Sequence, residues 1–363
     1  MTKNHIIGHL DMDAFFASLE ERATPRFKNK PLVVGSDPKN GKGRGVVSTA
    51  NYKAREYGIH SALPISQAWK LSQQAKNSGK EEVIFLPSNF DLYERSSRNI
   101  LKIIKEFSET VEQGSIDEFY FDLSKYKNYK EAEKVCKKIK EKILAEEKIT
   151  CSIGIAPNKL ISKIAAGINK PNGFLAVKEK DINTFLDPLS IKKIPGIGSK
   201  TKEILNINNI VCIKDIRNIQ KEQLQKILHI KTGNDIYLKA NGIDNSPIVE
   251  DREVKSIGGQ ITFEEDIFNI VSISEKFLTH CEEIFNKFKI SKFSSFKKIT
   301  IIIRLSDFTT ISSAKTLKNK FEKTDIKKVK LEALKLLLPF LDKRKNKKSK
   351  SIRLIGIRLE NFS

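Results

Sequence analysis

Two hydrophobic patterns alternate along the first half of the chain. Short apolar runs are typical of buried strands, and apolar residues that recur every three or four positions are typical of amphipathic helices. The predicted strands are 5–11, 31–35, 46–49, a hairpin within 111–123, and 150–155, and the predicted helices are 16–21, 51–57, 66–74, 91–108, 129–147 and 158–168. This mixed order predicts a first domain of the α+β or α/β class.

The pattern changes twice in the second half of the chain. From 181 to 243 it predicts short helices only, punctuated by Gly and Pro. Residues 244–254 are polar and without period, which is typical of a linker. The last predicted elements are strands at 256–263, 298–305 and 351–359 and helices near 272–289 and 325–341. They predict a second α+β domain with a split β-α-β arrangement.

The charge balance indicates a polyanionic partner. The 66 Lys+Arg and 44 Asp+Glu of the 363 residues give a net charge of +22. Such an excess favours nucleic acid before membrane, through phosphate neutralisation and counterion release. A Lys-rich genome composition is the alternative reading. Residues 255–363 hold 24 Lys+Arg and 12 Asp+Glu, a net +12, and this concentration in one domain weakens that alternative.

The cysteines and the apolar runs indicate where the protein works. Four cysteines stand far apart without paired spacing, so neither a zinc site nor a disulfide framework is predicted. No signal-like start and no membrane-spanning run is evident. We therefore expect a cytoplasmic protein without a membrane partner.

Two acidic pairs stand about a hundred residues apart in predicted strands. Alternate side chains of a strand share a face, so Asp11 and Asp13 can point the same way, with Met12 opposite. Asp117 and Glu118 follow in the hairpin, and the carboxylates converge if the two strands are neighbours. Oxygen ligands without His or Cys select Mg²⁺, and two such ions about 4 Å apart drive in-line phosphoryl transfer. A lone Asp-x-Asp is also typical of a solvated strand end, but the second pair favours metal binding.

Several donors could neutralise a triphosphate. Tyr52 and Arg55 are three apart and share a helix face, and Lys163 follows the strand at 150–155. The backbone amides of residues 13–16, at a predicted helix start, could also bind phosphate. A Tyr-x-x-Arg pair on its own is more typical of a helix surface, so the spacing leaves both readings open.

A series of motifs follows in one order along the chain. They are Asp11-Met-Asp-Ala-Phe-Phe-Ala-Ser-Leu-Glu20, Val47-Ser-Thr-Ala-Asn-Tyr-Lys-Ala-Arg-Glu-Tyr-Gly58, Ser115-Ile-Asp-Glu118, Ser152-Ile-Gly-Ile-Ala-Pro-Asn-Lys159, Lys163-Ile-Ala-Ala166, Lys170-Pro-Asn-Gly173 and Ile194-Pro-Gly-Ile-Gly198. The series covers essentially the whole chain and resembles the Y family of DNA polymerases, with the DinB type as the nearest match.

This resemblance implies an α+β multidomain fold, a right hand with a mixed-sheet palm, small fingers, a helical thumb and a C-terminal α+β little finger. The implied ranges are 1–17 and 81–175 for the palm, 18–80 for the fingers, 176–243 for a thumb with a helix-hairpin-helix, 244–254 for the linker and 255–363 for the little finger. The implied activity is template-directed DNA synthesis of low fidelity, without a 3′→5′ exonuclease. It would serve translesion synthesis, damage tolerance and untargeted mutagenesis.

The resemblance also implies roles for single residues. Asp11, Asp117 and Glu118 would be catalytic and would hold two Mg²⁺ ions, with Mn²⁺ as a substitute and the Met12 carbonyl as a further ligand. Phe16 would be a steric gate whose ring clashes with a 2′-OH. The implied nucleotide contacts are Tyr52, Arg55, Lys163, Thr49 and the backbone of Phe15, and the expected DNA contacts are Gly196, Gly198, Lys200, Arg304 and Arg353. The Asp13 side chain is not a family ligand, so we expect structural support from it, and a core position for the Phe15 ring.

The expected partners are primer–template DNA, dNTPs and a sliding clamp, and the expected state is a monomer. The final residues Arg358-Leu-Glu-Asn-Phe-Ser363 show no clear clamp-binding peptide, so clamp binding would use another surface or a segment outside this sequence. The basic run Lys343–Lys350 reads equally as a solvated loop or as a DNA contact. Two alternative functions stay open: a metal-dependent nuclease, and a catalytically silent polymerase-like DNA-binding protein.

Overall fold

The structure is a computed structural model that describes residues 5–251, 253–342 and 350–363. Contacts divide the chain into two compact units, Met1–Gly41 with Val46–Asp251, and Lys42–Gly45 with Arg252–Ser363. The boundary near residue 251 lies inside the predicted linker. Within the described ranges, no helix has the length and apolar character needed to cross a membrane.

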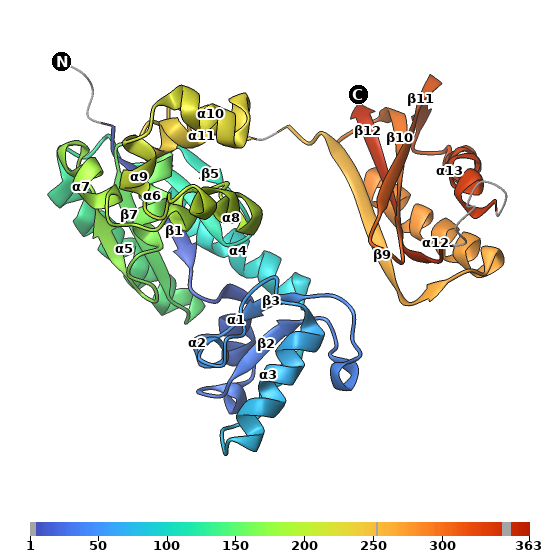
Figure 1. Ribbon diagram of the computed structural model, residues 1–363, viewed down its shortest axis with the longest axis horizontal. Helices are drawn as coiled ribbons and strands as arrows, with labels where there is room; N and C mark the ends of the chain where they lie inside the picture. The colour runs from blue at the N-terminus through green and yellow to red at the C-terminus, as the bar shows by residue number, and fades with distance from the viewer. Residues whose placement is uncertain (1–4, 252, 343–349) are drawn as a thin grey trace. The chain divides into compact units, whose positions relative to one another are not determined.

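A five-stranded mixed sheet forms the centre of the first unit (Figure 1). Its strand order is β5 (Val111–Gln113), β6 (Glu118–Asp122), β1 (Ile7–Met12), β7 (Cys151–Ala156) and β8 (Phe174–Ala176). The β7–β8 pair is parallel and the other pairs are antiparallel. The strands are short and apolar because both faces of the sheet are partly covered by helices.

Helices cover the two faces of this sheet differently. The long helices α4 (Phe90–Lys105) and α5 (Tyr129–Glu147) pack on the face that carries Leu10 and Phe119, and together they form one apolar core. Helix α6 (Lys159–Ala166) packs against β1 and β7 on the opposite face. Gly154 permits this approach, because a Cβ there would lie 2.2 Å from the Ser162 carbonyl oxygen. The face under α6 is also the one that carries Asp11.

A smaller part of the first unit lies between β1 and α4 in the sequence. It contains a three-stranded sheet of order β3 (Val47–Ala50), β2 (Leu32–Gly35) and β4 (Ile84–Leu86). Its helices are α1 (Phe15–Ala23), α2 (Tyr52–Arg55) and α3 (Ile65–Asn77), with the short turns η1 (Pro25–Phe27) and η2 (Lys39–Gly41). Val33, Val47, Ile59 and Ile65 belong to a separate apolar core of this part.

Short helices complete the first unit, as the sequence predicts for 181–243. They are η3 (Glu179–Asp181), α7 (Ile182–Leu186), η4 (Ile191–Lys193), α8 (Ser199–Ile207), α9 (Ile213–Arg217), α10 (Lys221–Leu228) and α11 (Ile230–Ala240). Their core is continuous with one side of α6. This core therefore joins the helical segment to the central sheet.

The first half of the predicted linker is attached to the first unit. Lys159 Nζ donates to Glu112 Oε2 (2.6 Å), and Glu112 Oε2 also accepts the Val249 amide (2.8 Å). The Leu160 amide donates to Asp244 Oδ2 at 2.9 Å. Residues 244–251 and 253–254 form no helix or strand, but polar composition could not reveal these specific hydrogen bonds.

The second unit is a four-stranded antiparallel sheet with two helices on one face (Figure 1). Its elements are β9 (Ser256–Ile267), α12 (Ile270–Lys289), β10 (Ser295–Leu305), β11 (Thr310–Glu322), α13 (Ile326–Leu341) and β12 (Ile352–Phe362). Helix α12 connects β9 to β10 along the chain, and the sheet order β11-β10-β12-β9 places β12 between these two strands. This is the predicted split β-α-β arrangement.

Three strands were not predicted, namely β4, β8 and β11. The first two have three residues each, too short for a pattern. The third is a long edge strand whose residues are mostly exposed, so Ser and Lys replace the apolar residues that would reveal it. Of the basic run Lys343–Lys350, all but Lys350 lies outside the described residues.

Candidate active site

Two carboxylates face each other across neighbouring strands of the central sheet. The antiparallel register of β1 and β6 pairs Asp11 with Glu118, and that of β1 and β7 pairs Asp11 with Ser152. Directly paired residues project on the same face. The sequence predicts convergence of the carboxylates only if the two acidic segments lie on neighbouring strands. The sheet order shows that β1 and β6 are neighbours.

Two lysine side chains contact these carboxylates. Lys163, on α6, donates to Glu118 Oε2, and Lys170, in the turn after α6, donates to Asp11 Oδ1. Lys170 Nζ also lies 3.3 Å from the Met12 carbonyl oxygen. The predicted carboxylate and carbonyl ligands therefore already bind positive charge. The sequence motif contains Lys170, but no role was predicted for it.

The surroundings shift the pKa values of the two carboxyl groups in opposite directions. Burial raises the pKa of Asp11 to about 6, although Lys170 opposes this effect. The His9 imidazole and the Lys163 ammonium lower the pKa of Glu118 to about 2, while burial acts in the opposite sense. A carboxylate beside a cation favours its charged form. Glu118 is thus ionised over the whole physiological range.

The third predicted ligand, Asp117, is the last residue of the turn between β5 and β6, directly before Glu118. Its carbonyl oxygen accepts the Met12 amide (3.0 Å) and its Oδ1 accepts the Ser115 hydroxyl (2.6 Å). Across the described ranges, no three His, Cys, Asp or Glu side chains are grouped closely enough to hold a metal ion as they stand. The donor set nevertheless fits a hard cation, because Asp11 Oδ1 and the Met12 carbonyl oxygen share one ammonium group.

Asp13 has a different environment from Asp11, as expected. Its side chain is 2% exposed, and it accepts hydrogen bonds from Thr150 Oγ1 (2.8 Å), Ser152 Oγ (2.9 Å) and the Asn172 amide (2.7 Å). The carboxylate thus holds the Lys170–Gly173 turn against β7. β1 ends at Met12, so Asp13 lies just beyond the strand. Its carboxylate still points to the side of Asp11, as expected, because it bonds Ser152, the cross-strand partner of Asp11, and lies 4.0 Å from Lys170 Nζ.

Phe16 stacks on a second aromatic side chain. Its ring lies 4.2 Å from the Tyr93 ring, centroid to centroid, with an interplanar angle of 10°. Tyr93 Oη donates to Glu20 Oε1 at 2.7 Å, so the Tyr93 ring is itself held in place. Phe16 is partly exposed, whereas Phe15 is buried in the core, as predicted for it. No signal in the sequence identified Tyr93.

The predicted nucleotide contacts lie on α2, β3 and α6. The Arg55 guanidinium stacks on the Tyr52 ring at 4.5 Å, so the two residues share a face as expected. Burial, with the Asp13 and Asp11 carboxylates, raises the pKa of Tyr52 to about 12. Thr49 is partly exposed in β3. Lys163 pairs with Glu118 here, so it would have to turn away to reach a phosphate.

The start of α1 differs in one respect from the prediction of free amides at residues 13–16. The Asp13 amide donates to the Thr150 carbonyl oxygen at 3.1 Å and is therefore not available to a phosphate. Ala14 has a left-handed backbone (φ 47°), and α1 begins at Phe15. The amide groups of the first helical turn start at that residue.

The predicted DNA contacts fall into an exposed turn and an open sheet face. Gly196 has a positive φ of 102°, and a Cβ on Gly198 would meet nothing within 4 Å, so the turn before α8 is accessible. Lys200 is exposed beside it. Arg304 pairs across strands with Leu354, on the sheet face away from the helices. Arg353 is occupied by Asp266 (3.6 Å) and by the Phe308 ring (4.5 Å).

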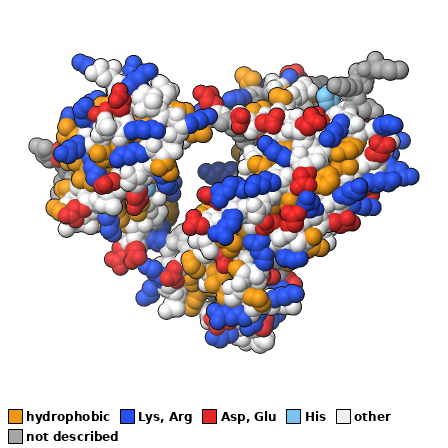
Figure 2. Space-filling view, turned by 180° about the vertical axis from the view of Figure 1, so that it is seen from behind, with side chains coloured by type: hydrophobic (Ala, Val, Ile, Leu, Met, Phe, Trp, Pro, Cys, Tyr) orange, Lys and Arg blue, Asp and Glu red, His pale blue; other side chains and the backbone are white. Residues whose placement is uncertain are grey.

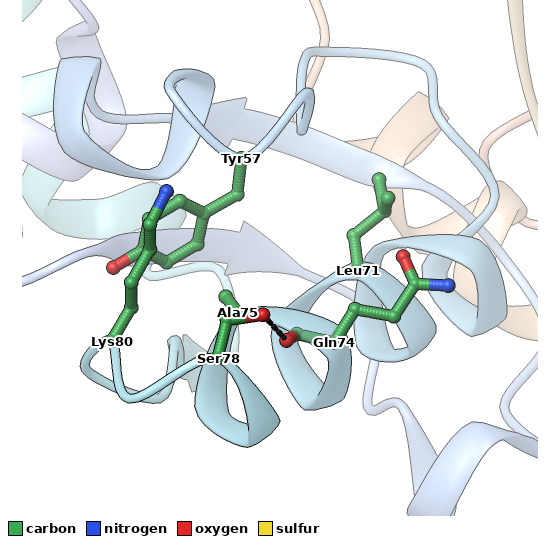
Figure 3. A pocket seen from close by; sticks show the side chains of 6 residues that line it. All are labelled: Tyr57, Leu71, Gln74, Ala75, Ser78 and Lys80. Atoms are coloured by element: carbon green, nitrogen blue, oxygen red, sulfur yellow. Dashed lines mark hydrogen bonds between the residues drawn. The ribbon is translucent and has the colours of Figure 1, made fainter.

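The surface of the described residues carries many basic side chains and a small pocket away from the predicted site. Figure 2 shows Lys and Arg side chains over much of the visible face, as the net charge of +22 requires. A small pocket beside α3 is drawn in Figure 3, where Lys80 lies over the Tyr57 ring and Ser78 Oγ donates to the Gln74 carbonyl oxygen. Its lining contains none of the predicted site residues.

Family models match most of the chain. Residues 10–167 match the impB/mucB/samB family, residues 254–363 match the C-terminal domain of that family, and residues 192–244 match a thumb domain described for DNA polymerase-iota. The three matches follow one another in the order of the cores described above.

Proteins similar to this chain over nearly its full length are known. "DNA polymerase IV 2" of Methanosarcina mazei is 40% identical over 98% of this chain and 92% of its own length. "DNA polymerase IV" of Clostridium perfringens is 35% identical over 100% of this chain and 96% of its own length.

Solved structures agree with these relatives. A Y-family DNA polymerase chimera of Dbh and Dpo4 has a TM-score of 0.84 at 30% identity, and DinB from Sulfolobus solfataricus has a TM-score of 0.64 at 30% identity. Both alignments cover 98% of this chain and 99% of the other. The chain therefore belongs to the DinB-type Y-family DNA polymerases, which are DNA-directed DNA polymerases.

Proposed function

We propose that the polymerase reaction takes place where Asp11 faces Glu118, with Asp117 and the Met12 carbonyl completing the site. The observation that supports this proposal is the cross-strand register, together with the two lysine ammonium groups that bind the carboxylate oxygens. Two Mg²⁺ ions, or Mn²⁺ in their place, would stabilise the charge that develops on the attacking and leaving oxygens. Y-family polymerases generally depend on divalent metals.

The lysines then have a second role in the proposal. Lys163 and Lys170 neutralise carboxylates that would otherwise repel each other. An incoming dNTP brings its own negative charge, and Lys163 would turn to it together with Tyr52, Arg55 and Thr49. The backbone of Phe15 would supply a helix-start amide. These groups contact phosphates and not the base, so they leave base choice to the template.

Phe16 is proposed to check the sugar. Its ring is held in one orientation by the stack on Tyr93, so it cannot easily yield to an extra hydroxyl group. Rejection by an occupied volume is effective only when that volume is rigid. A ribonucleotide would therefore be excluded without any contact specific to its base.

The apolar cores support a division of labour, although Val83 and β4 pack with the three-stranded sheet and Leu32 and Val34 with the central core. We assign residues 1–17 and 81–175 to the palm, 18–80 to the fingers, 176–243 to the thumb and 255–363 to the little finger, with 244–254 between them. The exposed turn at Gly196, Gly198 and Lys200 would contact the DNA backbone through amide groups. Arg304 would add a phosphate contact from the second unit, and Arg353 a further one only after leaving Asp266.

The proposed biological role is translesion synthesis by a monomer in the cytoplasm, with a sliding clamp as partner and without a 3′→5′ exonuclease. Small residues occupy the strand and turn near the proposed nucleotide site, namely Ser48, Ala62 and the buried Ala50. A pocket that does not enclose the base pair gains little differential transition-state binding, so mismatches and lesions pass more readily. Low fidelity and damage tolerance follow from this.

Primer extension on undamaged and lesion-containing templates tests the proposal. With Mg²⁺ and dNTPs, we expect the wild-type protein to extend the primer past at least one lesion and not to shorten it. Asp117→Ala should abolish extension, while Asp251→Ala, an exposed carboxylate in the same unit, should not. Shortening of the primer would support a metal-dependent nuclease. DNA binding without extension would support a catalytically silent polymerase-like DNA-binding protein.

A further inference from the structure

A buried histidine lies behind the acidic pair. His9 is in β1, two residues before Asp11, and therefore on the same face of the sheet. Its side chain is 0% exposed. Across the strands it pairs with Tyr120 on one side and with Gly154 on the other. Nothing in the sequence motifs assigned it a role.

Neither ring nitrogen of His9 has a hydrogen-bond partner within the described part of the chain. A buried polar group without a partner is destabilising, so a phenylalanine or leucine would fill this position more favourably. A neutral imidazole has one N–H donor and one acceptor, and in either tautomer the donor of His9 has no partner among the described residues. An unsatisfied donor kept at this position suggests a use beyond packing.

The nearest acidic atom to this ring belongs to Glu118. His9 Nε2 lies 3.7 Å from Glu118 Oε2, which is the same oxygen that accepts the Lys163 ammonium. The Tyr120 ring packs against the imidazole with centroids 4.5 Å apart and an interplanar angle of 58°. The imidazole is thus confined beside the carboxylate, just beyond the about 2.7–3.2 Å of an ordinary hydrogen bond.

We propose that His9 is a positioning residue for Glu118, an inference that rests on the catalytic role proposed for that carboxylate. When Lys163 turns to a nucleotide, Glu118 loses its donor, and His9 Nε2–H takes over at the same oxygen after a shift of about 0.5–1 Å. The imidazole then fixes one carboxylate oxygen and leaves the other for a metal ion. Partners of this kind orient ligating carboxylates in many metal sites.

His9 acts only through Glu118 in this account. It lies beneath the carboxylate in the sheet and does not touch nucleotide or DNA. Its removal should therefore slow the chemical step and weaken metal binding, and leave the affinity for the nucleotide unchanged. A histidine that only fills space would give neither effect, provided that its replacement has a similar volume.

Two substitutions at His9 and one matched control separate these possibilities. His9→Phe keeps a planar ring and removes both nitrogens, while His9→Gln keeps an N–H donor near the position of Nε2. His280→Phe is the control, because His280 is also buried and also has an unpartnered Nε2, but lies in α12 of the second unit. Glu118→Gln tests the underlying catalytic assignment.

Four quantities are measured for each variant: the single-turnover rate of incorporation, the nucleotide Kd, the Kd for Mn²⁺ alone by electron paramagnetic resonance, and the thermal midpoint. For His9→Phe we expect the rate to fall about 10- to 100-fold and the Mn²⁺ Kd to rise by at least about 10-fold. The nucleotide Kd should stay unchanged, and the thermal midpoint should not fall, because the replaced ring has no hydrogen-bond partner in the part of the chain that the structure describes. His9→Gln should recover most of the rate, and His280→Phe should match the wild type.

The opposite results would overturn the inference. A His9→Phe rate and Mn²⁺ Kd within about twofold of wild type, or a His9→Gln variant as slow as His9→Phe, would reduce His9 to a packing residue. If His9→Phe does not fold, the comparison of His9→Gln with His9→Leu decides in the same way. A fully active Glu118→Gln variant would instead refute the catalytic assignment, and an inactive one beside a normal His9→Phe would refute only the role of His9.

Discussion

The Asp13 carboxylate offers the sharpest test of how the site is built. It is almost fully buried and accepts three hydrogen bonds. The donors are the Thr150 hydroxyl just before β7, the Ser152 hydroxyl in β7 and the Asn172 amide. Asp13→Ala removes the acceptor for all three donors. The hydroxyl groups of Thr150 and Ser152 can rotate toward other acceptors, but the Asn172 amide is fixed in the turn.

The expected cost follows from these contacts. One buried amide left unsatisfied costs about 1–3 kcal/mol, and hydrogen bonds to a charged group contribute about 1.5–3 kcal/mol each before the hydroxyl groups find new partners. We therefore expect Asp13→Ala to lower the free energy of unfolding by about 3 kcal/mol. The Lys170–Gly173 turn should also loosen, because Asp13 is what holds its backbone to the strand.

Urea denaturation followed by tryptophan fluorescence measures this change. The chain has a single tryptophan, Trp69, in α3 of the first unit, so the signal reports on the unit that contains Asp13. Asp251→Ala is the control, since that carboxylate is exposed. The reasoning is refuted if Asp13→Ala unfolds within about 0.5 kcal/mol of the wild type, the range of ordinary surface substitutions.

Two further predictions concern the aromatic pair and the thiols. Phe16→Ala removes the ring stacked on Tyr93, so ribonucleotide incorporation should rise by at least about 10-fold in a competition assay while Mn²⁺ binding stays the same; unchanged sugar selectivity would exclude a gate here. In the native protein a thiol reagent should modify Cys212, which is partly exposed, and fast labelling of a second cysteine would contradict the packing. The other three cysteines, Cys136, Cys151 and Cys281, should react only after unfolding, because they are buried and burial raises the pKa of their thiols.

The sequence predicted elements best where packing repeats a simple period. Helix α5 has the predicted bounds of 129–147, because its apolar residues face one core along its whole length. Strand β11 could not be predicted, because an edge strand exposed over most of its length has no apolar alternation. The docking of residues 244–249 also escaped prediction, since it depends on the buried pair Lys159–Glu112, residues far away in sequence.

The sequence predicted those residues of the candidate site that belong to a recognisable motif. The motifs named Asp11, Glu118 and Phe16, and the structure brings the first two together. They could not name His9, Lys170 or Tyr93 as partners, because those relations arise from strand register and from the packing of α4 and α6. Physical partners of a site residue are set by tertiary contacts, which leave only weak traces in a single sequence.

Single-turnover nucleotide incorporation by Asp11→Asn and Glu118→Gln tests the central claim most directly. Both substitutions keep the shape of the side chain and remove its charge, and Glu81→Gln, on an exposed carboxylate, is the control. If the polymerase site lies where these two residues face each other, each variant should lose about 100- to 1,000-fold in rate while still binding primer–template DNA. A rate within tenfold of the control, roughly 1.4 kcal/mol in the barrier, would place the reaction elsewhere.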